Sequence, residues 1–242
     1  MSRFFVKKLN EVHIEIDASE FHMLKELVDY FTFKVPGAEF MPSFKNKVWD
    51  GKIRMFNPIN RKLYLGLLNH LDYFCRKNNY TVEFENDLTD TNFSIENLAE
   101  LVRHINPHSQ GKPIGYRDYQ LDAIHHSIVN NRTLLVSPTA SGKSLIIYTL
   151  CRFYNMHPKV KSKKILIIVP TVSLVQQMYG DFKDYGWNVE KYCHKISAGI
   201  DKNTDKKVVI STWQSIYKMG FDYFDQFGVV IGDECHLFKA NS

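Results

Sequence analysis

The segment Ser137-Pro138-Thr139-Ala140-Ser141-Gly142-Lys143-Ser144 decides how this chain is interpreted. It follows an aliphatic run at 133–136, which we predict to be a buried strand, and it precedes an apolar stretch at 145–147 with helical character. A tight turn at a helix N-terminus directs several backbone N–H groups towards one anion. The order strand, turn and helix therefore predicts a phosphate-binding loop.

Two side chains of this loop carry specific predicted roles. Lys143 would reach the β- and γ-phosphates of a nucleotide, and the Ser144 hydroxyl would ligate Mg²⁺. The strict pattern has glycine where Ser137 stands, so an ordinary serine-rich turn between a strand and a helix is the alternative. The other predicted nucleotide contacts of the loop are Thr139, Ala140, Ser141 and Gly142.

A second element, Asp233-Glu234-Cys235-His236, follows another aliphatic strand at 229–231. Two adjacent carboxylates at a strand end suit a nucleoside triphosphatase, in which Asp233 would hold Mg²⁺ and Glu234 would activate the attacking water. Taken alone, such residues can form a solvated acidic loop. Together with the phosphate-binding loop, they favour ATP hydrolysis.

The composition excludes several classes of protein. Of 242 residues, 44% are hydrophobic and 24% are charged, which is typical of globular proteins and not of disordered or collagen-like chains. The longest aliphatic run, 165–169, is far shorter than the roughly 20 residues that cross a bilayer. The N-terminus lacks the apolar stretch of a secretion signal, so we expect a cytoplasmic protein with no membrane partner.

The net charge and the spacing of the cysteines limit the partners and the metal or redox sites to be expected. The net charge of +5 is compatible with anionic partners without identifying one. The four cysteines show no short paired spacing of the kind found in zinc sites or redox pairs, so we expect four reduced thiols.

The pattern of strands and helices predicts an α/β protein with two domains. Beyond residue 113, buried strands at 133–136, 164–169, 208–211 and 229–231 alternate with amphipathic helices, which indicates a parallel sheet. We expect this domain over 113–242, a helical linker over 87–112, and a small α/β accessory domain over 1–86.

The accessory domain contains a basic and aromatic cluster at 44–62. The pair Asp50-Gly51 predicts a hairpin whose strands are 47–49 and 53–56. Such a surface could grip phosphates and stack on bases, and the predicted nucleic-acid contacts are Lys45, Trp49, Lys52 and Arg54. In the alternative, the aromatic residues form the inward face of the hairpin and the cations its solvated face.

From the motifs above and three others, the chain resembles the superfamily 2 helicases of the DEAD/DExH type. The resemblance covers about 113–242, with Ala140 replacing the usual Gly and Ser144 the usual Thr. The additional motifs are Tyr116-Arg117-Asp118-Tyr119-Gln120, Pro170-Thr171-Val172-Ser173-Leu174-Val175-Gln176-Gln177 and Ser211-Thr212-Trp213-Gln214-Ser215. A glycine-containing loop at Ser197-Ala198-Gly199 also lies where the family often places a backbone contact.

The resemblance implies a RecA-like fold, ATP and Mg²⁺ as cofactors, and roles for these motifs. Gln120 would read the adenine edge, with Arg117 nearby. The implied contacts to the nucleic-acid backbone are Thr171, Gln176, Ser197, Gly199, Thr212 and Gln214. Because such helicases have two RecA-like lobes, we expect a missing second lobe in a longer chain, and near-zero turnover by this one alone.

The resemblance further implies an ATP-dependent DNA helicase that remodels branched or forked DNA in recombination, repair and replication. RNA–DNA hybrids are a second substrate class that stays open. Two alternatives remain at this point. One is a double-stranded DNA translocase of the restriction or remodelling type, and the other is a catalytically silent nucleic-acid-binding protein.

Overall fold

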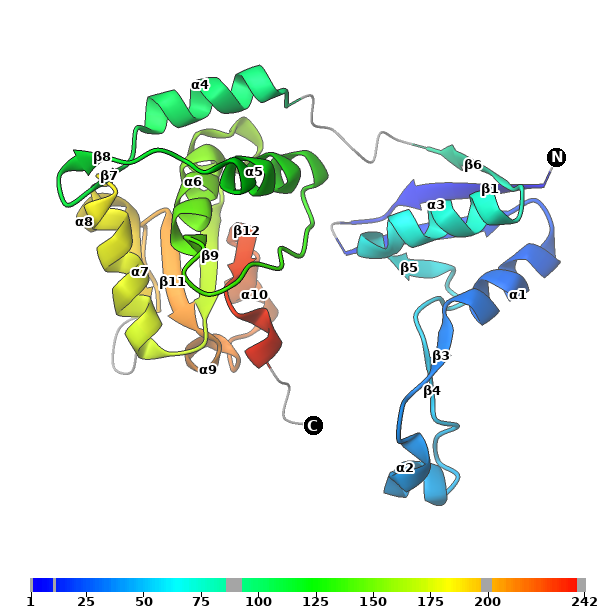
Figure 1. The fold of residues 1–242 in the computed structure, drawn as a ribbon. Helices are drawn as coiled ribbons and strands as arrows, with labels where there is room; N and C mark the ends of the chain where they lie inside the picture. Colours follow the sequence, from blue (N-terminus) through cyan, green and yellow to red (C-terminus); the bar gives the residue numbers. More distant parts are fainter. Residues whose placement is uncertain (1, 11, 86–92, 197–201, 239–242) are drawn as a thin grey trace. The chain divides into compact units, whose positions relative to one another are not determined.

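The computed structural model describes residues 2–10, 12–85, 93–196 and 202–238. The chain divides into two compact units, Met1–Asp90 and Thr91–Ser242, and each is described by itself (Figure 1).

Unit 1 is built on a four-stranded sheet with the strand order β5-β2-β1-β6. Strand β1 pairs antiparallel with β2 and parallel with β6, and β2 pairs antiparallel with β5. The elements are β1 (Arg3–Lys8), β2 (His13–Ala18), α1 (Phe21–Tyr30), β5 (Lys62–Tyr64), the 3₁₀ turn η2 (Leu65–Leu67), α3 (Leu68–Lys77) and β6 (Thr81–Phe84).

Alternation along the strands creates the core of unit 1. In β1, Phe4 and Val6 are buried, whereas Phe5 between them is 41% exposed, because successive side chains of a strand point to opposite faces. Ile14 and Ile16 of β2 are buried in the same way. The helices contribute to this one cluster through Met23, Leu24 and Leu27 of α1 and Leu71, Phe74 and Cys75 of α3.

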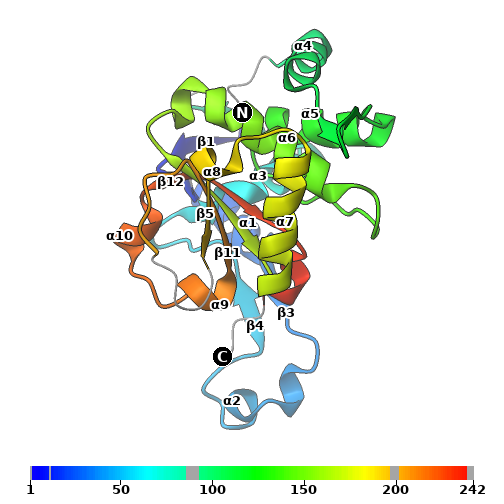
Figure 2. The ribbon, with the colours of Figure 1, turned by 90° about the vertical axis from the view of Figure 1, so that its left-hand side faces the viewer.

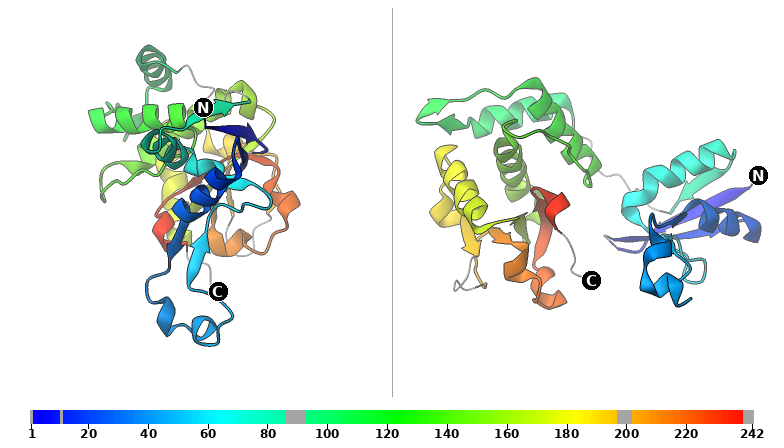
Figure 3. Two further views of the ribbon diagram at one scale, coloured as in Figure 1. Left: turned by 90° about the vertical axis from the view of Figure 1, so that its right-hand side faces the viewer. Right: turned by 60° about the horizontal axis from the view of Figure 1, so that its bottom comes forward.

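A two-stranded arm, residues 32–54, extends from this sheet. Strands β3 (Thr32–Lys34) and β4 (Lys52–Arg54) pair antiparallel, with Thr32 opposite Arg54. Figures 1 and 3 show the two strands running away from the sheet to a tip that carries α2. The tip consists of the 3₁₀ turn η1 (Ala38–Phe40) and the short helix α2 (Pro42–Lys45).

The predicted hairpin at Asp50-Gly51 is wrong. Gly51 has the expected positive φ of 74°, but residues 47–49 form no strand, and the partner of Ile53 is Phe33. The Trp49 indole Nε1 instead donates to the Lys52 carbonyl at 2.9 Å. The glycine therefore closes a larger lobe at the tip of the arm, and not a two-residue turn.

Unit 2 contains a parallel sheet with the strand order β10-β11-β9-β12, which confirms the predicted α/β fold. Its strands are β9 (Lys164–Val169), β10 (Cys193–Ile196), β11 (Val208–Thr212) and β12 (Phe227–Gly232). A small antiparallel pair is formed by β7 (His108–Ser109) and β8 (Lys112–Pro113). The helical elements are α4 (Ile95–Ile105), α5 (Asp118–Asn130), α6 (Lys143–Met156), η3 (Pro158–Val160), α7 (Val172–Asp184), α8 (Val189–Tyr192), α9 (Trp213–Ile216), α10 (Phe221–Phe224) and η4 (Cys235–Leu237).

Both faces of the parallel sheet are covered, as expected for parallel strands. On β9, Ile165 and Ile167 belong to one buried cluster with residues of α5, α6 and α7, whereas Leu166 and Ile168 belong to a second cluster with residues of α9 and α10. Figure 2 shows α7 along one side of these strands. The central strands are therefore continuous apolar runs, which is why the sequence located them accurately.

The predicted strand at 133–136 is wrong. This run is not part of any ladder of the described residues, and Leu134 and Val136 are 74% and 94% exposed. Strand β12 pairs only with β9 in the described sheet, so its other edge lacks a partner strand, and Val230 is 60% exposed. The aliphatic composition of residues 133–136 indicated a strand. Composition, however, does not determine whether a segment forms backbone hydrogen bonds with a neighbouring strand.

Three further observations concern a helix cap, the length of the helices and the thiols. Ser94 caps α4, because its hydroxyl accepts from the backbone N–H of Asn97 at 3.3 Å. None of the helices in the described ranges is both long and apolar enough to cross a bilayer. All four cysteines are free thiols, and burial raises the pKa of Cys75 and Cys193 to about 12.

The alternation in β1 generates a paired prediction. Phe4→Ala should lower the free energy of unfolding of unit 1 by about 3–5 kcal/mol, because it empties a fully buried aromatic site. Phe5→Ala, one residue along on the exposed face, should cost less than about 1 kcal/mol. Urea denaturation with hydrogen exchange read in β1 and β2 measures both, and equal losses would contradict the alternation.

Candidate functional site

Three loops of unit 2 leave the same edge of the parallel sheet. The register aligns Thr212 of β11 with Val169 of β9, and Gly232 of β12 with Ile168. The loops after β9, β11 and β12 therefore begin side by side at the carboxyl ends of the strands, where open α/β sheets bind ligands. Thr171 and Asp233 lie in the loops after β9 and β12, and Thr212 is the last residue of β11.

The phosphate-binding loop meets this edge through one ion pair. Lys143 is the first residue of α6, directly after Gly142, whose φ of 80° lies in the left-handed region. The Lys143 ammonium donates to Glu234 Oε1. Glu234 itself has a φ of 51°, a conformation that few residues other than glycine adopt. The structure thus joins the two elements that the sequence assigned to phosphate binding and water activation.

The charged side chains of Lys143, Glu234 and Asp233 shift one another's pKa values. The bond to Glu234 raises the pKa of Lys143, and the same bond lowers the pKa of Glu234. Burial raises the pKa of Asp233, and nearby Lys143 partly offsets that effect. His236 Nδ1 lies 3.5 Å from the other Glu234 oxygen, Oε2. The edge therefore holds two carboxylates of different environment beside one ammonium.

Gln120 ties the start of α5 to the phosphate-binding loop. Its Oε1 accepts from the Arg117 backbone N–H at 3.0 Å, and its Nε2 donates to the Ser141 carbonyl at 3.0 Å. The side chain is buried, and both ends of its amide are hydrogen-bonded within the chain. The predicted reading of adenine by Gln120 stays a prediction, and what the structure shows is a brace for the loop.

Two tyrosines without a predicted role also contact the phosphate-binding loop. Tyr119 Oη donates to the Ser141 carbonyl at 2.9 Å and accepts from Arg117 at 2.9 Å. Tyr185 Oη lies 2.9 Å from Ser144 Oγ, so the predicted magnesium ligand is engaged by an aromatic hydroxyl that follows α7. Tyr119 lies within the motif at 116–120 that also contains Gln120, whereas no sequence signal connects Tyr185 with the loop.

The loop itself is shaped by its small residues. Ala140 has a φ of 63°, in the left-handed region that glycine adopts most readily. Thr139 and Ala140 are exposed, whereas Ser141 is buried and its hydroxyl lies 2.5 Å from that of Ser137. The exposed part of the loop is therefore free to contact a ligand, and the buried part holds its conformation.

The predicted nucleic-acid contacts of unit 2 differ in accessibility. Thr171 caps α7, and its hydroxyl accepts from the Leu174 backbone N–H at 3.3 Å. Gln176 is exposed and accepts from Lys195 at 2.8 Å, and Gln214 is also exposed. Thr212 is buried with its hydroxyl 2.9 Å from that of Ser215, so its side chain does not reach the surface. Ser197 and Gly199 lie outside the described residues.

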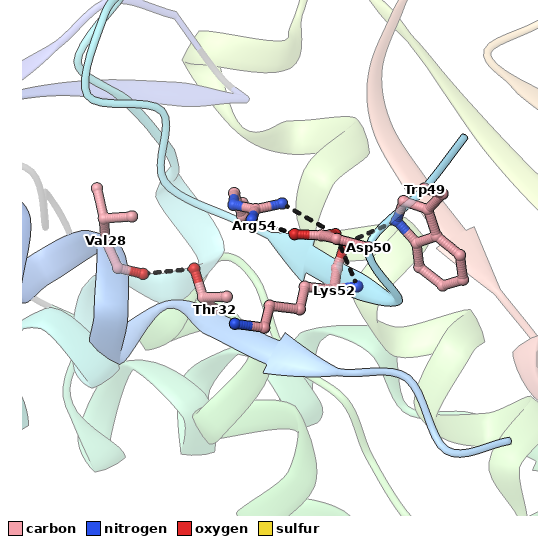
Figure 4. Close-up of polar contacts among 6 residues, drawn as sticks. All are labelled: Val28, Thr32, Trp49, Asp50, Lys52 and Arg54. Atoms are coloured by element: carbon pink, nitrogen blue, oxygen red, sulfur yellow. Dashed lines mark hydrogen bonds and ion pairs between the residues drawn. The ribbon is translucent and has the colours of Figure 1, made fainter. Parts of the chain in front are cut away.

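The predicted contacts of unit 1 lie on the arm. Arg54 pairs with Asp50 through both guanidinium nitrogens, the Nη1–Oδ1 distance being 3.3 Å (Figure 4). Trp49 and Lys52 are linked by the indole bond described above, and the Lys52 side chain is exposed. Lys45, Trp49 and Arg54 line a common hollow at the tip of the arm, which Lys52 does not line.

Comparison with known proteins places both units. The family model "Type III restriction enzyme, res subunit" matches residues 113–242, and the model "DNA helicase UvsW, N-terminal" matches residues 3–85. The ATP-dependent DNA helicase uvsW of Enterobacteria phage T4 is 36% identical over 238 residues, which cover 96% of this chain and 46% of that protein. The chain therefore spans about half the length of this relative.

Solved structures agree with the sequence comparison. The UvsW helicase from bacteriophage T4 superposes with a TM-score of 0.86 at 34% identity, covering 98% of this chain and 84% of that one. A second structure, of T4 UvsW, gives a TM-score of 0.87 at 35% identity, covering 97% of this chain and 47% of that one. These matches confirm the resemblance to superfamily 2 helicases that the motifs indicated.

The contact between Gly142 and Gln120 generates a stability prediction. A Cβ at Gly142 would lie 2.4 Å from Gln120 Nε2 on a left-handed backbone, so Gly142→Ala should cost about 2 kcal/mol or more. In a Gln120→Ala background the cost should shrink, because the steric part disappears.

Gly180→Ala is the matched control for this substitution. Gly180 lies exposed within α7 with open space around its Cβ position, so alanine there should stabilise by about 0.5–1 kcal/mol. Urea denaturation of the four variants measures these differences. A cost at Gly142 that is the same with and without Gln120 would contradict the proposed brace.

Proposed function

Because this chain belongs to the superfamily 2 helicases, we propose that it forms the nucleotide-binding part of an ATP-dependent DNA helicase. The observation that carries the proposal is the contact between Lys143 and Glu234, which brings the phosphate-binding loop and the DExH element to one edge of the sheet. A silent nucleic-acid-binding protein would not need an intact ammonium, hydroxyl and carboxylate pair at this place. ATPase activity with and without DNA distinguishes the two.

The proposed chemistry uses the charges already present. In the free chain, Lys143 is held by Glu234, and we propose that it exchanges this carboxylate for the β- and γ-phosphates of ATP. Glu234 is then released from its cation and can accept the proton of the attacking water. Backbone N–H groups at the start of α6, with Thr139 and Ala140 beside them, would hold the phosphate oxygens.

Asp233 and Ser144 fit a magnesium site in their chemistry. Carboxylate and hydroxyl oxygens are the ligands that Mg²⁺ prefers, and the ion would neutralise charge on the phosphates. The Asp233 carboxylate is the stronger of the two proposed ligands, because the Ser144 hydroxyl is engaged by Tyr185. Its raised pKa reflects half-burial, a cost that a bound cation would relieve.

DNA is the proposed partner of both units. In unit 2 we propose backbone contacts at Thr171, Gln176 and Gln214, with Thr212 positioning the last of these through Ser215. In unit 1 the arm adds a second DNA-binding surface, which supports branched or forked DNA as the substrate and a role in recombination, repair and replication. We propose that the protein does this work in the cytoplasm of a host cell, and RNA–DNA hybrids are the second substrate to test.

One observation favours a second candidate function. The match to the res subunit of type III restriction enzymes supports a double-stranded DNA translocase that does not separate strands. Strand displacement on forked DNA, measured in a protein that carries both RecA-like lobes, distinguishes a helicase from a translocase. Release of the labelled strand supports the helicase, and DNA-stimulated ATP hydrolysis without release supports the translocase.

Nucleotide binding by this chain tests the loop. Lys143→Ala should abolish detectable ATP binding, because it removes the charge that neutralises the phosphates. Gln120→Ala should instead relax the discrimination between ATP and GTP. Titration with fluorescent ATP and GTP measures both variants. Equal ATP binding by the wild-type chain and Lys143→Ala would disprove the assignment of this loop.

The rate of ATP hydrolysis tests the proposed role of the Glu234 carboxylate. In a protein with both lobes, Glu234→Gln should still bind ATP while turnover falls about 10²-fold or more, since the variant keeps the size of the side chain but loses the base. Steady-state phosphate release with parallel ATP titration provides the measurement. Undiminished turnover would show that Glu234 is not the base.

A further inference from the structure

The tip of the arm carries an open hollow that is lined by both aromatic and charged residues. Its volume is about 880 Å³, within the roughly 300–1,000 Å³ of sites that take small organic groups. Aromatic and charged residues share the lining. The residues are Glu39, Phe44, Lys45, Lys47, Val48, Trp49, Asp50 and Arg54.

Two aromatic side chains of this lining are held in place by the backbone. The ring of Phe44 packs over Gly51, where a Cβ would lie 3.0 Å from its Cδ2 and Cε2 atoms. Trp49 is fixed by its Nε1 bond to the Lys52 carbonyl (Figure 4). Each ring is therefore anchored at one side while it still lines the hollow, so little side-chain freedom is lost when a ligand binds.

The charges of the lining are not all neutralised. Asp50 is paired with Arg54, which lowers the pKa of Asp50 and keeps it anionic. Lys45 and Lys47 are exposed, and the side-chain ammonium of neither has a hydrogen-bond or ion-pair partner in the part of the chain that the structure describes. Two free ammonium groups beside fixed aromatic rings suit a ligand that has both a flat face and phosphates.

We propose that this hollow takes one unpaired base of DNA at a branch point, with the ring of Trp49 on its face and Lys45 and Lys47 on the adjoining phosphates. Within a duplex, both faces of a base are covered by its neighbours, so only an unpaired base offers a face for stacking. Glu39 supplies an acceptor for the N–H groups of the exposed base edge. The inference rests on the proposed function and adds the DNA structure that the arm recognises.

The test uses 2-aminopurine as a fluorescent base in two DNA probes. One probe places it unpaired at the branch of a fork, and the other places it paired within a duplex. Binding of the wild-type chain should quench the fork probe and leave the duplex probe unchanged. Trp49→Ala should remove the quenching and weaken fork binding about 5- to 150-fold, the factor that corresponds to one stacked base, with little change for the duplex.

Phe40→Ala is the matched control. Phe40 lies on the same arm and is 75% exposed, but it does not line the hollow, so quenching and affinity should stay at the wild-type values. Trp49→Phe keeps an aromatic ring and loses only the indole bond to Lys52. Trp49→Phe should retain most of the quenching. This variant therefore tests the stacking role even if Trp49→Ala destabilises the arm and lowers the melting temperature. Loss of quenching in Trp49→Phe as complete as in Trp49→Ala would overturn the proposal.

A third variant separates this inference from the proposed function. Replacing Lys45 and Lys47 together by Ala should weaken fork binding and reduce its salt dependence by about two phosphate contacts. If that variant weakens fork and duplex alike while Trp49→Ala changes neither, the base-binding hollow is wrong and DNA binding by the arm stands. If the wild-type chain binds neither probe, the proposed DNA-binding function of unit 1 fails.

Discussion

The ion pair between Lys143 and Glu234 joins residues 91 positions apart in the chain, and the candidate site depends on it. Both side chains are partly exposed, and side by side the ammonium and the carboxylate stabilise one another's charged forms. The same pairing keeps the ammonium close to the place where a nucleotide's phosphates would bind. A triphosphate carries more negative charge than one carboxylate, so under the proposed function it would displace Glu234 and leave that group free to act as a base.

The hydrogen bonds around this pair keep the loop in shape. Gln120 and Tyr119 both donate to the Ser141 carbonyl, and Gly142 leaves room for the Gln120 amide. A loop fixed in this way loses little conformational freedom when a ligand binds. The arm of unit 1 follows the same principle on a smaller scale, because Trp49 and the Asp50–Arg54 pair are held while Lys45 and Lys47 remain free. In both places the cations that we propose to bind phosphate lie beside residues whose side chains are held by hydrogen bonds.

The sequence predicted those parts of the molecule that depend on local pattern. Strand β9 was located residue for residue, because burial on both faces makes it a continuous apolar run in the sequence. The hairpin at Asp50-Gly51 and the strand at 133–136 were wrong, because both depend on which segment pairs with which, and local pattern does not specify a partner. For the same reason the Tyr185 contact to Ser144 could not be predicted. The domain boundary at residue 86 stays a prediction, since 86–92 lie outside the described residues.

We propose that the carboxylate of Glu234 occupies the place of a phosphate beside Lys143 until nucleotide binds. A crystal structure of this chain with a non-hydrolysable ATP analogue and Mg²⁺ would show this directly. In that complex we expect the Lys143 ammonium to have left Glu234 and to lie within hydrogen-bonding distance of the β- or γ-phosphate, while the bond from Gln120 to Ser141 is retained. A complex in which Lys143 still binds Glu234, or in which the phosphates lie away from the start of α6, would contradict it.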